Sequence, residues 1–64
     1  RLARRLEQLE AQIEDLDSQI SQLQEAMQAT NDASELMESQ KQIDQLTATQ
    51  EEAMLEWEEL AEKV

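Results

Sequence analysis

The chain has 64 residues and contains no cysteine, histidine, glycine or proline, and its 16 acidic and five basic residues give a net charge of −11. A chain this short seldom buries a self-sufficient globular core without disulfides or a metal, so its stability must come from regular helix packing. The charge disfavours nucleic acid and anionic membranes as partners, and the absence of a membrane-length apolar run and of a signal peptide leads us to expect a cytoplasmic protein.

The first half of the chain carries an apolar residue alternately every four and every three positions, which is the heptad seam of a coiled coil. Arginine, glutamate, aspartate and glutamine fill most of the positions between the seam residues. This pattern predicts a helix over about residues 2–30. Its seam consists of Leu2, Leu6, Leu9, Ile13, Leu16, Ile20, Leu23, Met27 and Thr30.

The heptad phase breaks after Thr30, because the next seam residue, Leu36, lies six positions further on. Neither a continued heptad nor an insertion of three or four residues explains that step. The segment Asp32-Ala33-Ser34-Glu35 fits a capping box, with its aspartate as the N-cap and its glutamate at the third helical position. The sequence therefore predicts a turn over about residues 31–35 and a second helix over about residues 33–64.

The second helix has a weaker seam, made of Leu36, Ser39, Ile43, Leu46, Gln50, Ala53, Trp57, Leu60 and Val64. A short turn makes the two helices antiparallel neighbours. One register pairs every layer of the two seams, and it places Leu9 against Trp57, Leu16 against Gln50, and Leu2 against Val64. We therefore expect an all-α fold, a single antiparallel two-helix coiled-coil hairpin over residues 1–64, which forms a segment of a larger protein.

The chain lacks the groups that enzymatic catalysis requires. It has no histidine or cysteine and no glycine loop for a phosphate, and a two-stranded coil offers no pocket. The run of glutamates from Glu51 to Glu62 spreads around a helix instead of converging, which favours a solvated face over a site for a divalent cation. We expect no catalytic residue, no cofactor-binding residue and no metal ligand.

Two seam residues have two interpretations each. Gln50 either fixes the register as a polar seam residue or turns its amide to solvent at the edge of the seam. Trp57 is either a core residue, which we favour, or a binding hot spot.

Beside Trp57 two apolar residues lie off the seam, and arginines gather at the same tip of the hairpin, so we predict an interaction surface there. Its candidate residues are Arg1, Arg4, Arg5, Met54, Leu55 and Trp57.

The segment Met54-Leu55-Glu56-Trp57-Glu58-Glu59-Leu60 resembles the final helix of the C-terminal extension of ABC-F ATPases of the Uup type. The heptads from Arg5 to Met27 resemble the first helix of that domain. The resemblance implies a parent protein with two ATP-binding cassettes, which bind ATP and magnesium outside this segment, and no transmembrane domain. It also implies work on ribosomes in translation or, for Uup-like members, association with DNA.

We therefore predict a non-catalytic accessory domain that positions its parent on a ribosome or another nucleic-acid-containing partner. Its expected partners are the body of the parent ATPase and a protein or ribonucleoprotein. Direct binding of the isolated segment to nucleic acid is not expected, because its few cations would act against the surrounding acid. Those cations are Arg1, Arg4, Arg5, Lys41 and Lys63.

A structural scaffold is the alternative function. In that case two hairpins associate into a homodimeric four-helix bundle through apolar residues outside the seam. The residues that would make this contact are Met37, Met54, Leu55 and Ala61.

Overall fold

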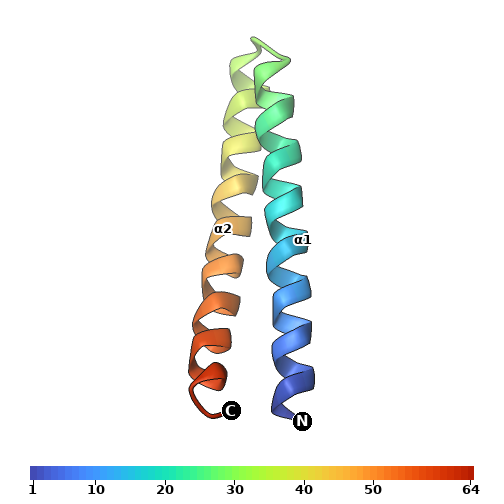
Figure 1. Ribbon diagram of the computed structural model, residues 1–64. Helices are drawn as coiled ribbons and strands as arrows, with labels where there is room; N and C mark the ends of the chain where they lie inside the picture. The colour runs from blue at the N-terminus through green and yellow to red at the C-terminus, as the bar shows by residue number, and fades with distance from the viewer.

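The computed structural model describes residues 1–64 and contains two helices, α1 (Leu2–Gln28) and α2 (Ala33–Ala61). The helices lie side by side and antiparallel, so both termini meet at one end of the molecule and the turn lies at the other (Figure 1). We call these the terminal end and the turn end. The molecule is a rod of 47 × 14 × 12 Å. The predicted all-α hairpin is confirmed.

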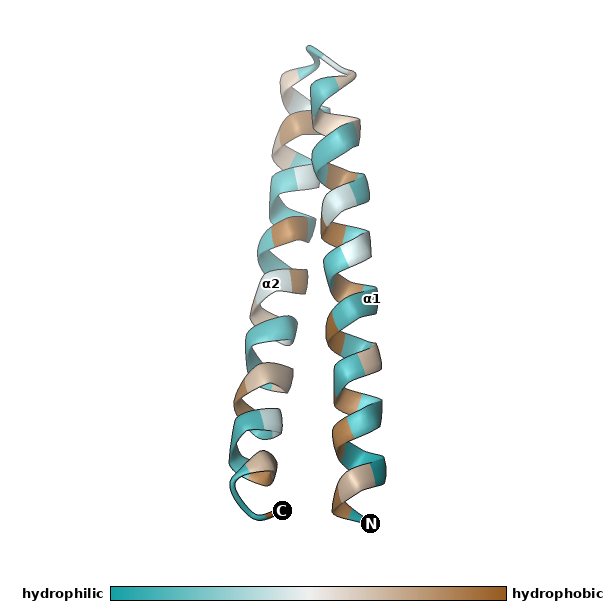
Figure 2. Ribbon diagram, in the orientation of Figure 1, coloured by the Kyte–Doolittle hydropathy of each residue, from teal (hydrophilic) through white to brown (hydrophobic).

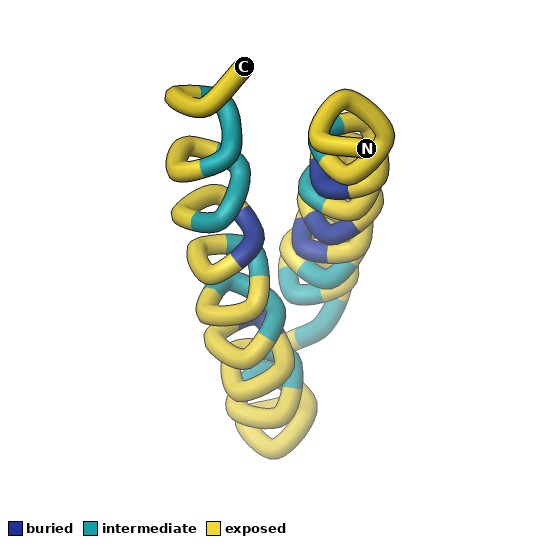
Figure 3. The backbone as a smooth tube through the Cα atoms, turned by 90° about the horizontal axis from the view of Figure 1, so that it is seen from below, coloured by how far each residue is buried: buried dark blue, intermediate teal, exposed yellow.

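Burial follows the predicted seam closely. The buried residues are Leu9, Leu16, Ile20, Ile43 and Ala53. All five belong to the seam, and in Figure 3 they lie on the sides of α1 and α2 that face each other. The apolar residues of α1 in Figure 2 lie mainly along that same side. Long-range apolar contact along one stripe of each helix is thus the core of this fold.

The outermost predicted layer, Leu2 against Val64, is wrong. Leu2 is 38 % exposed and Val64 is 76 % exposed. The helix α2 ends at Ala61, and the backbone N–H groups of Lys63 and Val64 donate to the carbonyls three residues earlier, at 3.0 and 3.4 Å. This tighter winding takes the last residues off the helical path that the heptad pattern assumes.

The helix α1 also ends earlier than predicted, at Gln28 instead of about residue 30. Ala29 has φ −92° and ψ 0°, and its N–H donates to the carbonyl of Ala26 at 3.1 Å. No glycine is available for a left-handed cap, so the helix closes with a bond to the third preceding residue. The shortened helix leaves Thr30 free to take part in the turn.

The predicted N-cap of α2 is present, but its capping box closes through an additional residue. The Asp32 carboxylate accepts the N–H groups of Ser34 and Glu35 at 2.8 and 3.4 Å. The Thr30 hydroxyl accepts the N–H of Asp32 at 3.1 Å and donates to the Glu35 carboxylate at 2.8 Å. Thr30 therefore links the two residues that bond directly in an ordinary capping box.

Neither helix contains a stretch long and apolar enough to cross a membrane.

Replacing Leu9 with alanine tests the seam. Leu9 is 1 % exposed, and truncating a leucine buried to this extent lowers the free energy of unfolding by about 2–5 kcal/mol. We expect a large fall in the thermal midpoint, measured by far-UV circular dichroism. Leu55→Ala is the matched control, because Leu55 is 60 % exposed and its truncation is expected to change stability by less than about 0.5 kcal/mol. Equal losses in the two variants would contradict the assigned core.

Replacing Asp32 with alanine tests the cap. Loss of its two accepted hydrogen bonds is expected to lower the free energy of unfolding by about 1 kcal/mol in urea titrations followed by circular dichroism. Asn31→Ala, at the neighbouring turn position, removes a side chain that caps no helix and serves as the control. A cap that contributes nothing would give the two variants the same midpoint.

Candidate interaction surface

Polar contacts join α1 and α2 at three points, all in the half of the rod nearer the terminal end. Arg5 donates from Nε and Nη2 to the two carboxylate oxygens of Glu56, at 2.7 and 2.8 Å. Trp57 donates from its indole nitrogen to Glu10 at 3.0 Å. Gln50 donates from its amide to the backbone carbonyl of Ile13 at 3.1 Å. These contacts fix the register where the seam carries its only aromatic residue.

The Arg5–Glu56 ion pair gives a partner within the hairpin to Arg5, one of the residues predicted for the interaction surface. Its two parallel hydrogen bonds are the bidentate geometry that a guanidinium makes with a carboxylate. The hydrogen bond from Arg5 lowers the pKa of Glu56, and the hydrogen bond to Glu56 raises the pKa of Arg5. Both side chains are nearly half exposed, so the pair favours one register but adds little stability.

Gln50 and Trp57 both belong to the helix contact. Gln50 is half-buried and its amide reaches across to α1, which supports the register-fixing interpretation over the one in which the amide turns to solvent. Trp57 is half-buried on the seam, and its ring N–H is held by Glu10. A tryptophan whose ring packs in the seam and whose ring N–H is hydrogen-bonded belongs mainly to the core. The preferred interpretation of Trp57 is consistent with this position.

The seam has two flanks of different chemistry. Residues two positions apart on a helix point about 200° apart, so Met54 lies on the side of α2 opposite Glu56. We call the side of the rod with Arg5 and Glu56 the ion-pair flank, and the side with Glu10 and Met54 the tryptophan flank. Residues one or two heptads from any of these lie on the same flank.

The exposed members of the predicted surface do not form one continuous patch. Met54 is 45 % exposed on the tryptophan flank, and Leu55 beside it is 60 % exposed on the outer face of α2. Arg4 lies midway between the seam residues Leu2 and Leu6, so it faces outward from α1, away from α2. We call these two exposed apolar residues the Met54/Leu55 patch. They are the members of the predicted surface that are both exposed and adjacent to each other.

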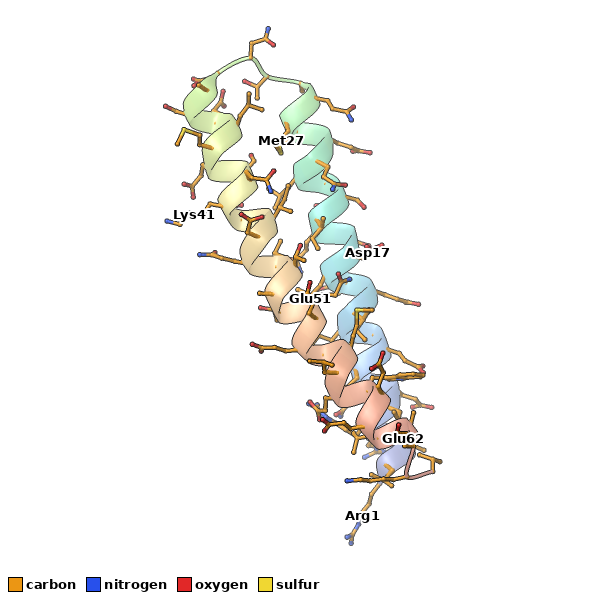
Figure 4. All side chains as sticks on the ribbon, turned by 90° about the vertical axis from the view of Figure 1, so that its left-hand side faces the viewer. Arg1, Asp17, Met27, Lys41, Glu51 and Glu62 are labelled. Atoms are coloured by element: carbon orange, nitrogen blue, oxygen red, sulfur yellow. The ribbon has the colours of Figure 1, made fainter.

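The terminal end also carries exposed charge of both signs. Arg1 precedes α1 without making a side-chain cap, and it lies at the same end of the rod as Glu62 (Figure 4). No acidic residue occupies the first turn of α1, and no basic residue occupies the last turn of α2. Neither helix therefore has a charge that compensates its dipole within its own terminal turn at this end.

Acidic side chains do not gather into a metal-binding group anywhere on the rod, since no three of them lie close enough to share an ion.

Sequence reasoning missed Glu10 as the partner of Trp57, and it did not single out Glu56 among the glutamates at the same tip as Arg5. The predicted register contained a signal for the ion pair. In an antiparallel coil, the positions that flank the seams on one side meet across the interface, and Arg5 and Glu56 occupy such positions. The direction in which the Trp57 ring turns depends on local packing, which the heptad pattern does not encode.

Comparison with models of known protein families matches residues 1–62 to the family described as ABC transporter C-terminal domain. No curated protein and no solved structure gives a significant match. The match covers both helices and the turn, so it concerns the whole hairpin and not one heptad stretch.

Replacing Glu56 with glutamine tests the ion pair and its pH dependence. Because the pKa of Glu56 is lowered in the folded state, the pair contributes stability above the ordinary pKa of glutamate, and that contribution is lost as the pH falls through the lowered value. We expect the variant to melt slightly below the wild type at neutral pH and at the same temperature in acid.

Glu59→Gln is the matched control for this experiment, because it removes one exposed carboxylate from the same helix without touching an ion pair. It corrects for the relief of charge repulsion in a chain of net charge −11. If Glu56→Gln and Glu59→Gln melt together at neutral pH, the ion pair contributes nothing.

Proposed function

The chain belongs to the ABC transporter C-terminal domain family, and on that premise we propose that it is a non-catalytic accessory domain of a cytoplasmic ABC-F ATPase of the Uup type. In this proposal the parent binds ATP and magnesium in its cassettes, and the hairpin supplies neither ligand. The hairpin positions the parent on a ribosome or another ribonucleoprotein. Family membership and the resemblance of the tryptophan-containing segment support this function.

The Met54/Leu55 patch is the observation on which the interaction role depends. The two residues are 45 % and 60 % exposed and adjacent, on a helix whose outer face is otherwise rich in carboxylates. Apolar residues that lie outside the seam and stay in contact with water favour a protein contact at that point. We propose that the patch packs on the body of the parent ATPase.

The shape of the rod supports this role. Both termini lie at the terminal end, so any polypeptide joined to them enters there, and the turn end projects away along the 47 Å length (Figure 1). The patch lies near the point of attachment. A contact at that position fixes the direction of the whole rod relative to the parent, which is what a positioning arm requires.

A homodimeric scaffold is a second candidate, favoured by Met37, which is 74 % exposed at the other end of α2. Met37 and the Met54/Leu55 patch would together make an apolar contact with a second hairpin. The net charge of −11 on each copy opposes this association, so a dimer of this kind should strengthen with added salt.

The double variant Met54→Gln/Leu55→Gln in the full-length parent tests the accessory function. Both side chains are exposed, so the hairpin should stay folded. Without the contact between the patch and the body of the parent, the direction of the rod would no longer be fixed. Co-sedimentation of the parent with ribosomes is therefore expected to fall several-fold, while its ATPase rate is unchanged. Met37→Gln is the control, since it removes an exposed methionine far from the patch and should leave co-sedimentation intact. Unchanged binding in the double variant would refute the proposal.

Sedimentation equilibrium of the 64-residue chain distinguishes the two candidate functions. A monomer at both low and high salt agrees with the accessory domain. A dimer that strengthens with salt and is lost in the same double variant would establish the scaffold function instead.

A further inference from the structure

The ion-pair flank changes character toward the turn end. Gln19 lies two heptads after Arg5, and Gln42 lies two heptads before Glu56, so these glutamines occupy the positions that the ion pair fills near the termini. Their amides do not bridge the helices. Gln19 donates to Asp15 at 2.8 Å and Gln42 donates to Glu38 at 3.4 Å, each within its own helix.

A groove of about 420 Å³ opens where the bridge is missing, so the expectation that a two-stranded coil offers no pocket is wrong. Its floor contains Leu23 and Leu46, which are seam residues that remain half-buried. Its walls are formed mainly by glutamines, namely Gln19, Gln22, Gln42 and Gln45. The seam is therefore accessible from this flank, with apolar side chains at the bottom and uncharged carboxamides at the sides.

The groove lies within a strongly anionic part of the rod. All 16 acidic residues fall between Leu6 and Glu62, and Lys41 is the only cation in that interval. Lys41 projects from α2 away from α1 (Figure 4). No charged side chain lines the groove itself, whereas Asp15 and Glu38 are hydrogen-bonded to two of its wall residues. An uncharged slot with an apolar floor is thus bordered by carboxylates.

We propose that this groove binds a basic amphipathic helix of a partner protein. An apolar side chain of that helix would pack on Leu23 and Leu46, and lysines or arginines on either side of it would face Asp15 and Glu38. Binding a helix by its apolar face in a groove is a common mode of peptide recognition. Glutamine walls suit it, because they can pair with polar groups of the partner without burying a charge.

Electrostatic repulsion disfavours other occupants of the groove. A second copy of this chain would bring another net charge of −11 to an anionic surface, and a nucleic acid would bring phosphates to it. The groove lies on the flank opposite Met54 and in the other half of the rod. The proposal therefore does not depend on the Met54/Leu55 patch or on the accessory function proposed for it.

Titration of the ¹⁵N-labelled 64-residue chain with synthetic peptides tests the partner chemistry. The probe is a lysine-rich amphipathic helix with a leucine stripe. One matched peptide carries glutamates in place of the lysines, and another carries glutamines in place of the leucines. We expect the first peptide alone to shift the backbone amides of residues 19–23 and 42–49. Equal binding by the acidic peptide, or equal binding by the peptide without leucines, would overturn the proposal.

A variant that closes the groove without changing the net charge tests the location. Gln19→Arg combined with Gln42→Glu places at these positions the residue types of the Arg5–Glu56 pair, and it should bridge the helices and cover the floor. Affinity for the basic amphipathic peptide is expected to fall at least tenfold, while circular dichroism shows a folded hairpin.

The matched control is Gln24→Arg combined with Gln40→Glu. Both residues are exposed and lie on the tryptophan flank, so the control makes the same two charge changes away from the groove. It should bind the peptide as the wild type does. Equal affinity in the closed variant and this control would show that the peptide binds the acidic surface in general and would overturn the assigned site.

Discussion

Apolar contact along the seam between α1 and α2 is the interaction on which the rest of this molecule depends. The chain has no disulfide, no metal-binding cluster and no globular core, so the free energy that offsets chain ordering must come from one stripe on each helix. That stripe also fixes the register. A one-heptad slip would leave leucines at one end without partners, and Arg5, Gln50 and Trp57 would lose the residues that they contact on the facing helix.

The sequence pattern was sufficient to predict the architecture, because a heptad repeat specifies both which residues are buried and how two helices align. The break in phase after Thr30 located the turn, and the capping motif located the start of α2. The ends of the helices were harder to predict, because a helix without glycine or proline at its boundary ends through local hydrogen bonding. The tightened winding at Ala29 and after Ala61 is of this kind, and it accounts for the failed pairing of Leu2 with Val64.

The interaction surface was only partly predictable, for a different reason. A heptad pattern assigns Met54 and Leu55 to positions outside the seam, and their exposure follows directly. It does not state whether a long charged side chain reaches across the interface, which is why Arg5 was placed in the candidate interaction surface. The same limit applies to Thr30, whose hydroxyl completes the cap of α2 although its position in the seam marks it only as a core residue.

The placement of the three cross-helix polar contacts has a mechanical consequence. Because both termini lie at one end, a pulling force between them would load the helix pair as a zipper and would separate its layers one after another from that end. The first layers to be loaded are the ones next to the Arg5–Glu56 pair and the Trp57–Glu10 bond. The half with the groove would come under load only after those contacts had separated, so the order of separation along the rod is set by the end at which the force is applied.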